Sequence, residues 1–248
     1  MKPLRSLIVV CARAGSERLP RKNFLRVAGT PEFPVRVCDY AIRAAKKACS
    51  QLADASWCIS SDDTMFCREE PNNLVLRPSR LCTAKASIHL ALKHALRAWE
   101  QEYGDSGFNA VISLQANVVT VTPEIVTQVE HLLEKFPKAT AVMTVKPAEC
   151  PPEWMFHWGK HRRFIERQAT SKRFRMQDLP QRYVPTGTCC AVRREVLMGC
   201  KSSAAFKWLG DSILPAIENG TVIEIHDRID LEQARAWLNR PAQWEDGK

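Results

Sequence analysis

Residues 10–23 read VCARAGSERLPRKN, and this stretch decides the fold and the ligand site of the chain. It begins at the end of the apolar run 7–10, which predicts a buried strand entering a sheet. A turn with Gly15 and Pro20 follows, and it carries four basic side chains against the single acid Glu17. A loop of this kind after a first strand offers backbone N–H groups and cations to a polyanion. The stretch therefore predicts a site for a nucleoside triphosphate.

Two common phosphate-binding motifs, G-x-x-x-x-G-K-[ST] and G-x-G-x-x-G, do not occur in the sequence. The loop instead has a set of residues at fixed spacing: Ala12, Arg13, Ser16, Pro20, Lys22 and Asn23. This set resembles the Ala-Arg-x-x-Ser-x-x-x-Pro-x-Lys-Asn signature of the sugar-acid cytidylyltransferases, which make CMP-sialic acid and CMP-Kdo. The alternative interpretation is a basic surface loop without a ligand.

The length of 248 residues is sufficient for one large α/β domain with a substantial core. A hydrophobic content of 45% with 25% charged residues is typical of globular proteins, which excludes a disordered chain. No apolar run approaches the roughly 20 residues of a membrane span, and 7–10 is too short for a signal-peptide core. We expect a single domain over 1–248 with an insertion at about 150–185, no membrane association and a cytoplasmic location.

Ten cysteines are spread along the chain without a C-x-x-C pair: Cys11, Cys38, Cys49, Cys58, Cys67, Cys82, Cys150, Cys189, Cys190 and Cys200. Most lie within predicted strands and helices, so we interpret them as reduced core residues. A structural zinc site is the alternative.

The net charge of +9 calls for an anionic partner, either nucleic acid or small anionic substrates. Basic residues are concentrated at 160–175: Lys160, Arg162, Arg163, Arg167, Lys172, Arg173 and Arg175. No aromatic-rich RNA-binding signature accompanies them, which favours small anionic substrates over nucleic acid.

Short apolar strands alternate with amphipathic helices, which predicts a Rossmann-like α/β fold with a mostly parallel sheet and helices on both faces. Strands are predicted at 56–60, 74–76, 110–114, 139–145, 188–192 and 221–225. Helices are predicted at 35–48, 87–99, from Thr122 and Pro123 onward, and from about Ile229.

The family resemblance continues along most of the chain and in the family's order. Segments that resemble the family are 60–63, 77–81, 86–87, 114–115, 179–187 and 225–231. The resemblance implies a Rossmann-like domain whose small insertion exchanges across a homodimer. It also implies that the anomeric hydroxyl of a keto-sugar acid attacks the α-phosphate of CTP and releases pyrophosphate.

The resemblance implies the following site. Arg13 and Lys22 contact the phosphates, with Ala12, Gly15 and Ser16 in the same cradle. Base selection falls to Asn23, Arg77, Ala86 and Ser87, since amide, guanidinium and helix N-terminal groups suit the donors and acceptors of cytosine. The sugar acid lies near Gln115 and Asn117, closed off by basic residues of the neighbouring subunit. Candidates for that closure are Arg162, Arg163, Arg167, Lys172 and Arg175. The alternatives are solvated cations on a loop and, for Arg77, a structural salt bridge.

Two departures from the family concern the sugar. Segment 116–121 reads ANVVTV where sialic-acid enzymes have Pro-Thr-Ser-Pro-Leu-Arg, and it also lacks the aspartate of the Kdo enzymes. Segment 186–190, TGTCC, has smaller side chains than the sialic-acid enzymes. These changes indicate a more apolar, reshaped pocket and another nonulosonic or octulosonic acid as substrate.

The third departure concerns the metal. Glu224 and His226 stand where the family has a Mg²⁺-binding Asp-x-Asp. A neutral imidazole is a poor ligand for Mg²⁺ and a better one for Mn²⁺. Asp227 is a substitute ligand or, with Asp230, a helix N-cap. The pair at 62–63 offers further carboxylates or only the polar end of a strand.

These observations together predict a CTP-dependent cytidylyltransferase that activates an acidic keto-sugar such as sialic acid, Kdo or a relative, with Mg²⁺ or Mn²⁺ as cofactor. The rival is a catalytically silent relative that binds nucleotide, which the altered metal positions support. A sugar-nucleotide glycosyltransferase would use D-x-D, a spacing that Asp62 and Asp63 lack.

Overall fold

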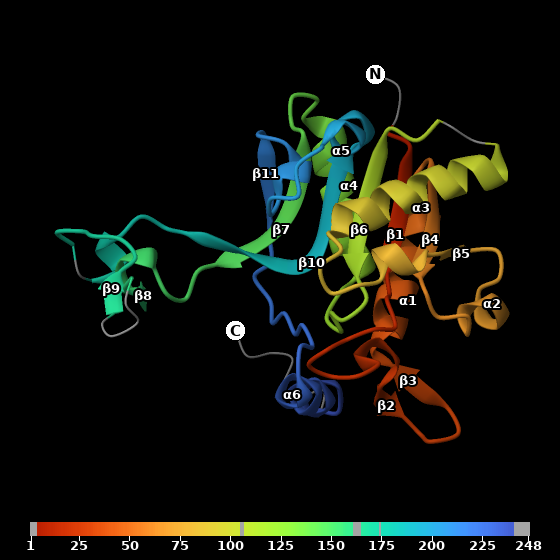
Figure 1. Cartoon of the computed structure of the whole chain (residues 1–248), viewed down its shortest axis with the longest axis horizontal. Coiled ribbons are helices and arrows are strands. Elements are labelled where there is room, and N and C mark those ends of the chain that lie inside the picture. The colour runs from red at the N-terminus through yellow and green to blue at the C-terminus, as the bar shows by residue number, and fades with distance from the viewer. Residues whose placement is uncertain (1–3, 105–106, 161–164, 174, 241–248) are drawn as a thin grey trace.

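Alternation along the first strand sets the layers of the fold. In β1 (Ser6–Cys11), Leu7 and Val9 are buried on one face of the sheet, and Ile8 and Val10 on the other. A strand buried on both faces requires cover on both sides of the sheet. The computed structural model describes residues 4–104, 107–160, 165–173 and 175–240, and its helices flank a central sheet (Figure 1).

The central sheet has seven strands in the order β11-β7-β10-β6-β1-β4-β5. β10 runs antiparallel to β6 and β7, and the other neighbours are parallel. Besides β1 the strands are β4 (Ala55–Ser61), β5 (Leu74–Leu76), β6 (Ala110–Gln115), β7 (Ala141–Pro147), β10 (Tyr183–Arg193) and β11 (Ile213–Ile217). The predicted α/β fold with a mostly parallel sheet is confirmed.

Two helices cover each face of this sheet. α1 (Val37–Gln51) and α4 (Pro123–Lys135) pack with Ile8 and Val10, whereas α3 (Ile88–Tyr103) and α5 (Arg194–Gly199) pack with Leu7 and Val9. The short α2 (Phe66–Glu69) follows β4, and α6 (Arg228–Leu238) packs near β2. No helix within the described ranges is long and apolar enough to span a membrane.

The start of α4 follows the predicted pattern, with Thr122 as N-cap and Pro123 as the first helical residue. The strand predicted at 221–225 is wrong. That segment forms one isolated bridge, from Glu224 to Val118, and leaves the sheet. The sheet edge is instead β11, which contains Pro215. Proline is tolerated in edge strands but weakens the strand signal in a sequence, which explains why β11 was not predicted.

Two small hairpin-like pairs lie outside the central sheet. β2 (Arg26–Gly29) pairs with β3 (Pro34–Arg36), and β8 (Phe156–Trp158) pairs with β9 (Ile165–Arg167). In Figure 1 the β8–β9 pair stands well away from the body, at the end of two long segments that continue β7 and β10. This pair falls within the segment predicted as an insertion.

Candidate functional site

Three parallel strands end at one edge of the sheet and place the candidate site there. At the end of β1, Cys11 stands opposite Ser60 of β4 and Gln115 of β6. Ligands of open α/β sheets bind at the carboxyl ends of such strands. A polar cavity of about 280 Å³ opens at this edge. Nine of the predicted site residues line it: Arg13, Gly15, Lys22, Asn23, Arg77, Ala86, Gln115, Asn117 and Glu224.

Side chains at the end of β4 fix the loop that follows β1. The Ser61 hydroxyl donates to the Ala12 carbonyl at 2.6 Å, and the Asp62 carboxylate accepts the Ala14 N–H at 2.7 Å. Asp63 forms an ion pair with Arg21 at 2.8 Å. The two aspartates therefore hold the loop and its basic residues in place, which is the structural alternative to a metal-binding pair.

Two cations of the cavity are held by carbonyl groups. Nη1 of Arg13 donates to the Thr83 carbonyl at 2.9 Å, and Nζ of Lys22 donates to the Ile225 carbonyl at 2.8 Å. Within the described ranges neither cation forms an ion pair. Burial lowers the pKa of Lys22, although the charge of nearby Glu224 acts in the opposite direction. Both positive charges remain available to an anionic ligand.

The side chain of Asn23 has one hydrogen-bond acceptor without a partner among the described residues. Its side chain is buried, and its amide nitrogen donates to the Arg13 carbonyl at 3.0 Å. Its amide oxygen is buried and has no partner within the described part of the chain. A buried acceptor without a donor is costly, so this oxygen suits an N–H or O–H group of a ligand in the cavity.

Arg77 lines the cavity and also has a structural role. Its Nε and Nη2 donate to the hydroxyl and the carbonyl of Ser60 at 3.2 and 2.9 Å. The side chain is buried and braces the end of β4. The structural interpretation of Arg77 is therefore supported, through hydrogen bonds to serine and not through a salt bridge.

Four of the predicted residues, Ala12, Ser16, Ser87 and His226, do not line the polar cavity. Ala12 is buried in the core, and its backbone N–H and carbonyl bind Ser60 and Ser61. Ser16 is half-buried outside the lining. Ser87 lines the adjoining cavity, with its hydroxyl 2.7 Å from Nδ1 of His89.

The side chains of Glu224 and His226 lie in contact. Oε2 of Glu224 lies 3.2 Å from Nε2 of His226, and Oε1 accepts from the Asn117 amide at 3.1 Å. Nδ1 of His226 lies 3.1 Å from Nη2 of Arg18, so both ring nitrogens have partners. Arg18 lies in the loop after β1, and no sequence signal links it to a residue 208 positions away.

The fit to a divalent metal rests on Glu224. Mg²⁺ is commonly held by one or two carboxylates together with substrate phosphates, and Glu224 is a cavity-lining carboxylate. His226 has no unpartnered nitrogen. Asp227 and Asp230 form a capping box at the start of α6, which confirms the N-cap alternative. Among the residues described, no three His, Cys, Asp or Glu side chains form a metal-binding group.

Gly187 allows Glu224 to reach its position. This glycine has a φ of +73°, and a Cβ atom there would lie 2.9 Å from Oε2 of Glu224. A side chain would therefore be strained and would push the carboxylate away. The segment 186–190 thus shapes the site through its backbone as well as through small side chains.

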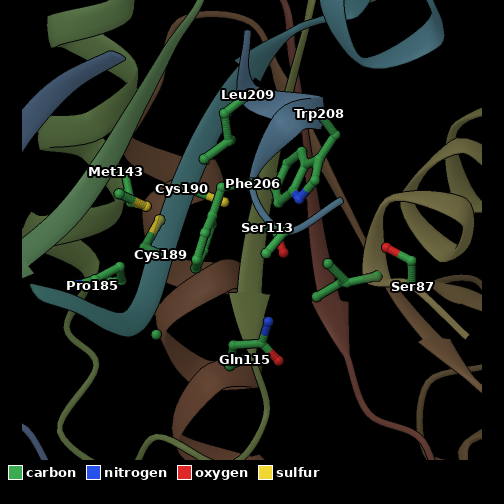
Figure 2. A pocket seen from close by; sticks show the side chains of 13 residues that line it. Ser87, Ser113, Gln115, Met143, Pro185, Cys189, Cys190, Phe206, Trp208 and Leu209 are labelled. Carbon is green, nitrogen blue, oxygen red and sulfur yellow. The ribbon is translucent and has the colours of Figure 1, made fainter. Parts of the chain in front are cut away.

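A second cavity of about 250 Å³ adjoins the polar one, and both are lined by Ile88 and Gln115. Figure 2 shows Gln115 at one end of it and Leu209 at the other, with Phe206 between the cysteines of β10 and Trp208. Phe206 and Trp208 were not predicted for the site. The apolar cluster FKWL at 206–209, between polar stretches, was the available signal.

The basic residues of the insertion line neither cavity within the described ranges. Arg167 and Lys172 are exposed, and Arg175 pairs with Asp178 at 2.8 Å. Arg162 and Arg163 lie outside the described residues.

Comparison with known proteins gives one sequence relative. The chain is 28% identical over 154 residues to the 3-deoxy-manno-octulosonate cytidylyltransferase of Psychrobacter arcticus, a match over 60% of this chain and 51% of the relative. The chain therefore spans about half the length of this relative. No protein-family model matches the chain.

Solved structures match over nearly the whole chain, each at 14% identity. CMP:2-keto-3-deoxy-manno-octonic acid synthetase complexed with CTP matches with a TM-score of 0.60, over 94% of this chain and 98% of that one. The 4-diphosphocytidyl-2C-methyl-D-erythritol synthase of Anaerococcus prevotii matches with a TM-score of 0.62, over 96% and 99%. A putative glucose-1-phosphate thymidylyltransferase of Bacillus anthracis matches with a TM-score of 0.58, over 96% and 98%.

The three structures establish the fold, and the sequence relative establishes the homology. The chain is thus related in sequence to a 3-deoxy-manno-octulosonate cytidylyltransferase, and it shares the α/β fold of the three solved structures.

Proposed function

We propose that this protein transfers the cytidylyl group of CTP to the anomeric hydroxyl of an acidic keto-sugar. In this reaction the sugar oxygen bonds to the α-phosphorus and the bond from that phosphorus to the bridging oxygen of pyrophosphate breaks. The products are the CMP-sugar, pyrophosphate and a proton. The printed names of the sequence relative and of a solved structure complexed with CTP support this reaction class.

The observation that carries the proposal is the polar cavity in which Arg13 and Lys22, within the described ranges, are bound only to carbonyl groups. Arg13 and Lys22 would hold the phosphates of CTP and neutralise the charge that grows on the departing pyrophosphate. Nucleotidyl transfer depends mainly on positioning and on charge stabilisation of this kind. The partial burial that lowers the pKa of Lys22 also strengthens its attraction to a bound phosphate.

The cytosine base would lie against Asn23, whose amide oxygen is the buried acceptor without a partner. The exocyclic amino group of cytosine supplies the missing donor. Uracil has a carbonyl in that place, so this contact would favour CTP over UTP. Ala86 lines the same cavity and would border the nucleotide.

Glu224 would hold Mg²⁺ or Mn²⁺ together with the nucleotide phosphates, and the ion would supply further charge neutralisation on the leaving group. His226 would orient Glu224 through the contact of its Nε2 with Oε2 of Glu224 and would not itself bind the ion. Asn117 would fix the other carboxylate oxygen from the opposite side.

We also propose that the protein forms a homodimer through the β8–β9 pair. The pair projects from the body, and it exposes Trp158 and Ile165 at 65% and 58% of their surfaces. Large apolar side chains on a projecting strand pair are typical of protein–protein contacts. Replacing both residues by serine should convert a dimer to a monomer in analytical ultracentrifugation, while Phe33→Ser, at another exposed aromatic residue, should not.

The test of the reaction is release of pyrophosphate from CTP with a panel of keto-sugar acids, with Mg²⁺ and Mn²⁺ in parallel. We expect release that depends on one class of sugar acid and is abolished by EDTA. Clear binding of CTP without release in the presence of any acceptor would instead indicate a relative that binds nucleotide without turnover.

A further inference from the structure

The cavity of Figure 2 is the place where an acceptor would meet the nucleotide. It shares Ile88 and Gln115 with the polar cavity, so a ligand that fills it reaches the phosphates at that junction. Its volume of about 250 Å³ corresponds to roughly eight waters at ~30 Å³ each, enough for a sugar-sized body and not only for solvent. The inference below rests on the proposed cytidylyl transfer.

The lining of this cavity is almost entirely apolar. Its walls come from Met143 of β7, Cys189 and Cys190 of β10, and the 3₁₀ turn with Trp208 and Leu209. No charged side chain lines it within the described ranges. Burial raises the pKa of Cys190 to about 12, so this thiol is neutral as well.

Few polar side chains are available to a ligand in this space. Among the described residues they belong to Ser87, Ser113 and Gln115, together with the indole N–H of Trp208. The Ser87 hydroxyl is already bound to Nδ1 of His89, and the Ser113 side chain is buried. A polyhydroxylated carbon chain would leave several hydroxyl groups without partners in this cavity, which disfavours its binding.

Phe206 supplies an independent observation. It has a φ of +60°, a conformation that bulky residues rarely adopt, and its side chain remains 48% exposed at the cavity. A backbone outlier of this kind is typical of functional sites, where the surrounding structure maintains it. Its position beside Trp208 and Cys190 in Figure 2 gives a bound apolar group a third wall.

We propose that the acceptor is a keto-sugar acid with uncharged, carbon-rich substituents, such as acylamino groups and a terminal methyl group, which fill this apolar cavity. Its carboxylate and anomeric hydroxyl lie at the Gln115 junction, on the side of Lys22 and Arg13. The chain therefore differs in acceptor choice from its relative named for an octulosonate, which carries hydroxyl groups in place of such substituents.

The test compares four acceptors of increasing apolar character with the full-length protein and CTP. They are 3-deoxy-manno-octulosonate, a nonulosonate with a hydroxyl at carbon 5, its 5-acetamido counterpart, and a 5,7-diacetamido-9-deoxy nonulosonate. We expect kcat/KM to rise along the series by about tenfold or more, because single apolar contacts discriminate by roughly 10–200-fold. Equal or highest kcat/KM with the octulosonate would overturn the inference and leave cytidylyl transfer intact.

The variant Phe206→Gly tests the role of Phe206 in acceptor binding separately from its effect on stability. Glycine accepts a positive φ, so the melting temperature should stay the same or rise. We expect KM for the best acceptor to rise about tenfold while KM for CTP stays unchanged, and Phe33→Gly serves as the control at an exposed aromatic residue. An unchanged acceptor KM in Phe206→Gly would contradict the inference.

Calorimetry of the same four acceptors, with a non-hydrolysable CTP analogue bound, distinguishes the two possible failures. Preferential binding of the acetamido compounds without turnover would sustain the cavity assignment and overturn cytidylyl transfer. Binding of none of the acceptors would overturn the inference.

Discussion

The two adjoining cavities differ in where their chemistry comes from. The polar cavity takes Arg13 and Lys22 from the loop after β1, Arg77 from the end of β5, and its carboxylate from a segment near the end of the described chain. The apolar cavity is built largely on neighbouring strands, by β6, β7 and β10, with one 3₁₀ turn added. Under the proposed function, loop residues would hold the nucleotide, while strand side chains and a short turn would distinguish one acceptor from another.

The largest expected effect is at the polar end. Lys22→Ala should lower kcat/KM by about 10³-fold, because it removes a partly buried cation from the phosphate site. The melting temperature should change little, since the Lys22 ammonium bonds only to the Ile225 carbonyl among the described residues. The exposed Lys138→Ala is the matched control. Full activity of Lys22→Ala in a pyrophosphate-release assay would show that the polar cavity is not the phosphate site, and the proposed difference between the two cavities would be wrong.

Glu224 gives the next largest effect. Glu224→Gln keeps the size of the side chain but removes the charge, and we expect a loss of about 10²-fold in kcat with a higher requirement for Mg²⁺. His226→Gln should cost less than tenfold, because that residue orients Glu224 without binding the ion. Titration of bound Mn²⁺ by electron paramagnetic resonance, with CTP present, provides the readout besides activity. Equal effects of the two variants would make His226 a ligand.

Gln115 tests whether the two cavities work as one site. Because it lines both, Gln115→Ala should raise KM for CTP and for the acceptor together, each by about three- to tenfold. The neighbouring Phe206→Gly should affect the acceptor alone. If Gln115→Ala changes only one KM, the cavities are separate sites.

A substitution of Glu130 should not change turnover, because this residue lies on α4, away from both cavities. Its expected effect is on stability. Burial raises the pKa of its carboxyl from 4.5 to about 7. The folded state therefore retains a proton that the unfolded chain loses, so stability is greatest below the ordinary pKa and falls as the pH rises from about 4.5 to 7.

Glu130→Gln should remove this loss. We expect the variant to be more stable than the wild type by roughly 2–3 kcal/mol at pH 8, with little difference near pH 4.5. Urea denaturation at both pH values measures it, and Glu102→Gln at an exposed position of α3 is the control. A wild-type stability that is flat between these pH values would show that Glu130 is ionised throughout.

The sequence predicted the polar cavity better than the apolar one, for a physical reason. Arg13, Lys22 and Asn23 lie within one loop at fixed spacing, so a short pattern identifies them together. Phe206 and Trp208 come from a turn whose role depends on how it folds back over β6 and β10. No periodic pattern in the sequence identifies such a residue as part of a ligand site. Its apolar character alone would place it in the hydrophobic core.

The same limit explains the single wrong strand and the contact missed at Arg18. Segment 221–225 has the apolar character of a strand, but it bonds to 117–119 at the end of the sheet and not along its edge. Arg18 and His226 meet because α6, which follows His226, packs beside the loop after β1. Long-range pairings of this kind follow from the topology and leave no local pattern.

A segment late in the described chain, residues 224–226, closes the loop after β1, and this bears on the order in which the site forms during synthesis. Lys22 and Asn117 both bond to the carbonyl of Ile225, and Glu224 and His226 complete the same corner. While the chain grows on the ribosome, the loop after β1 and the end of β6 emerge long before their partners. A nascent chain that stops before His226 therefore lacks the corner that fixes Lys22, and the proposed nucleotide site forms only after this segment has been made.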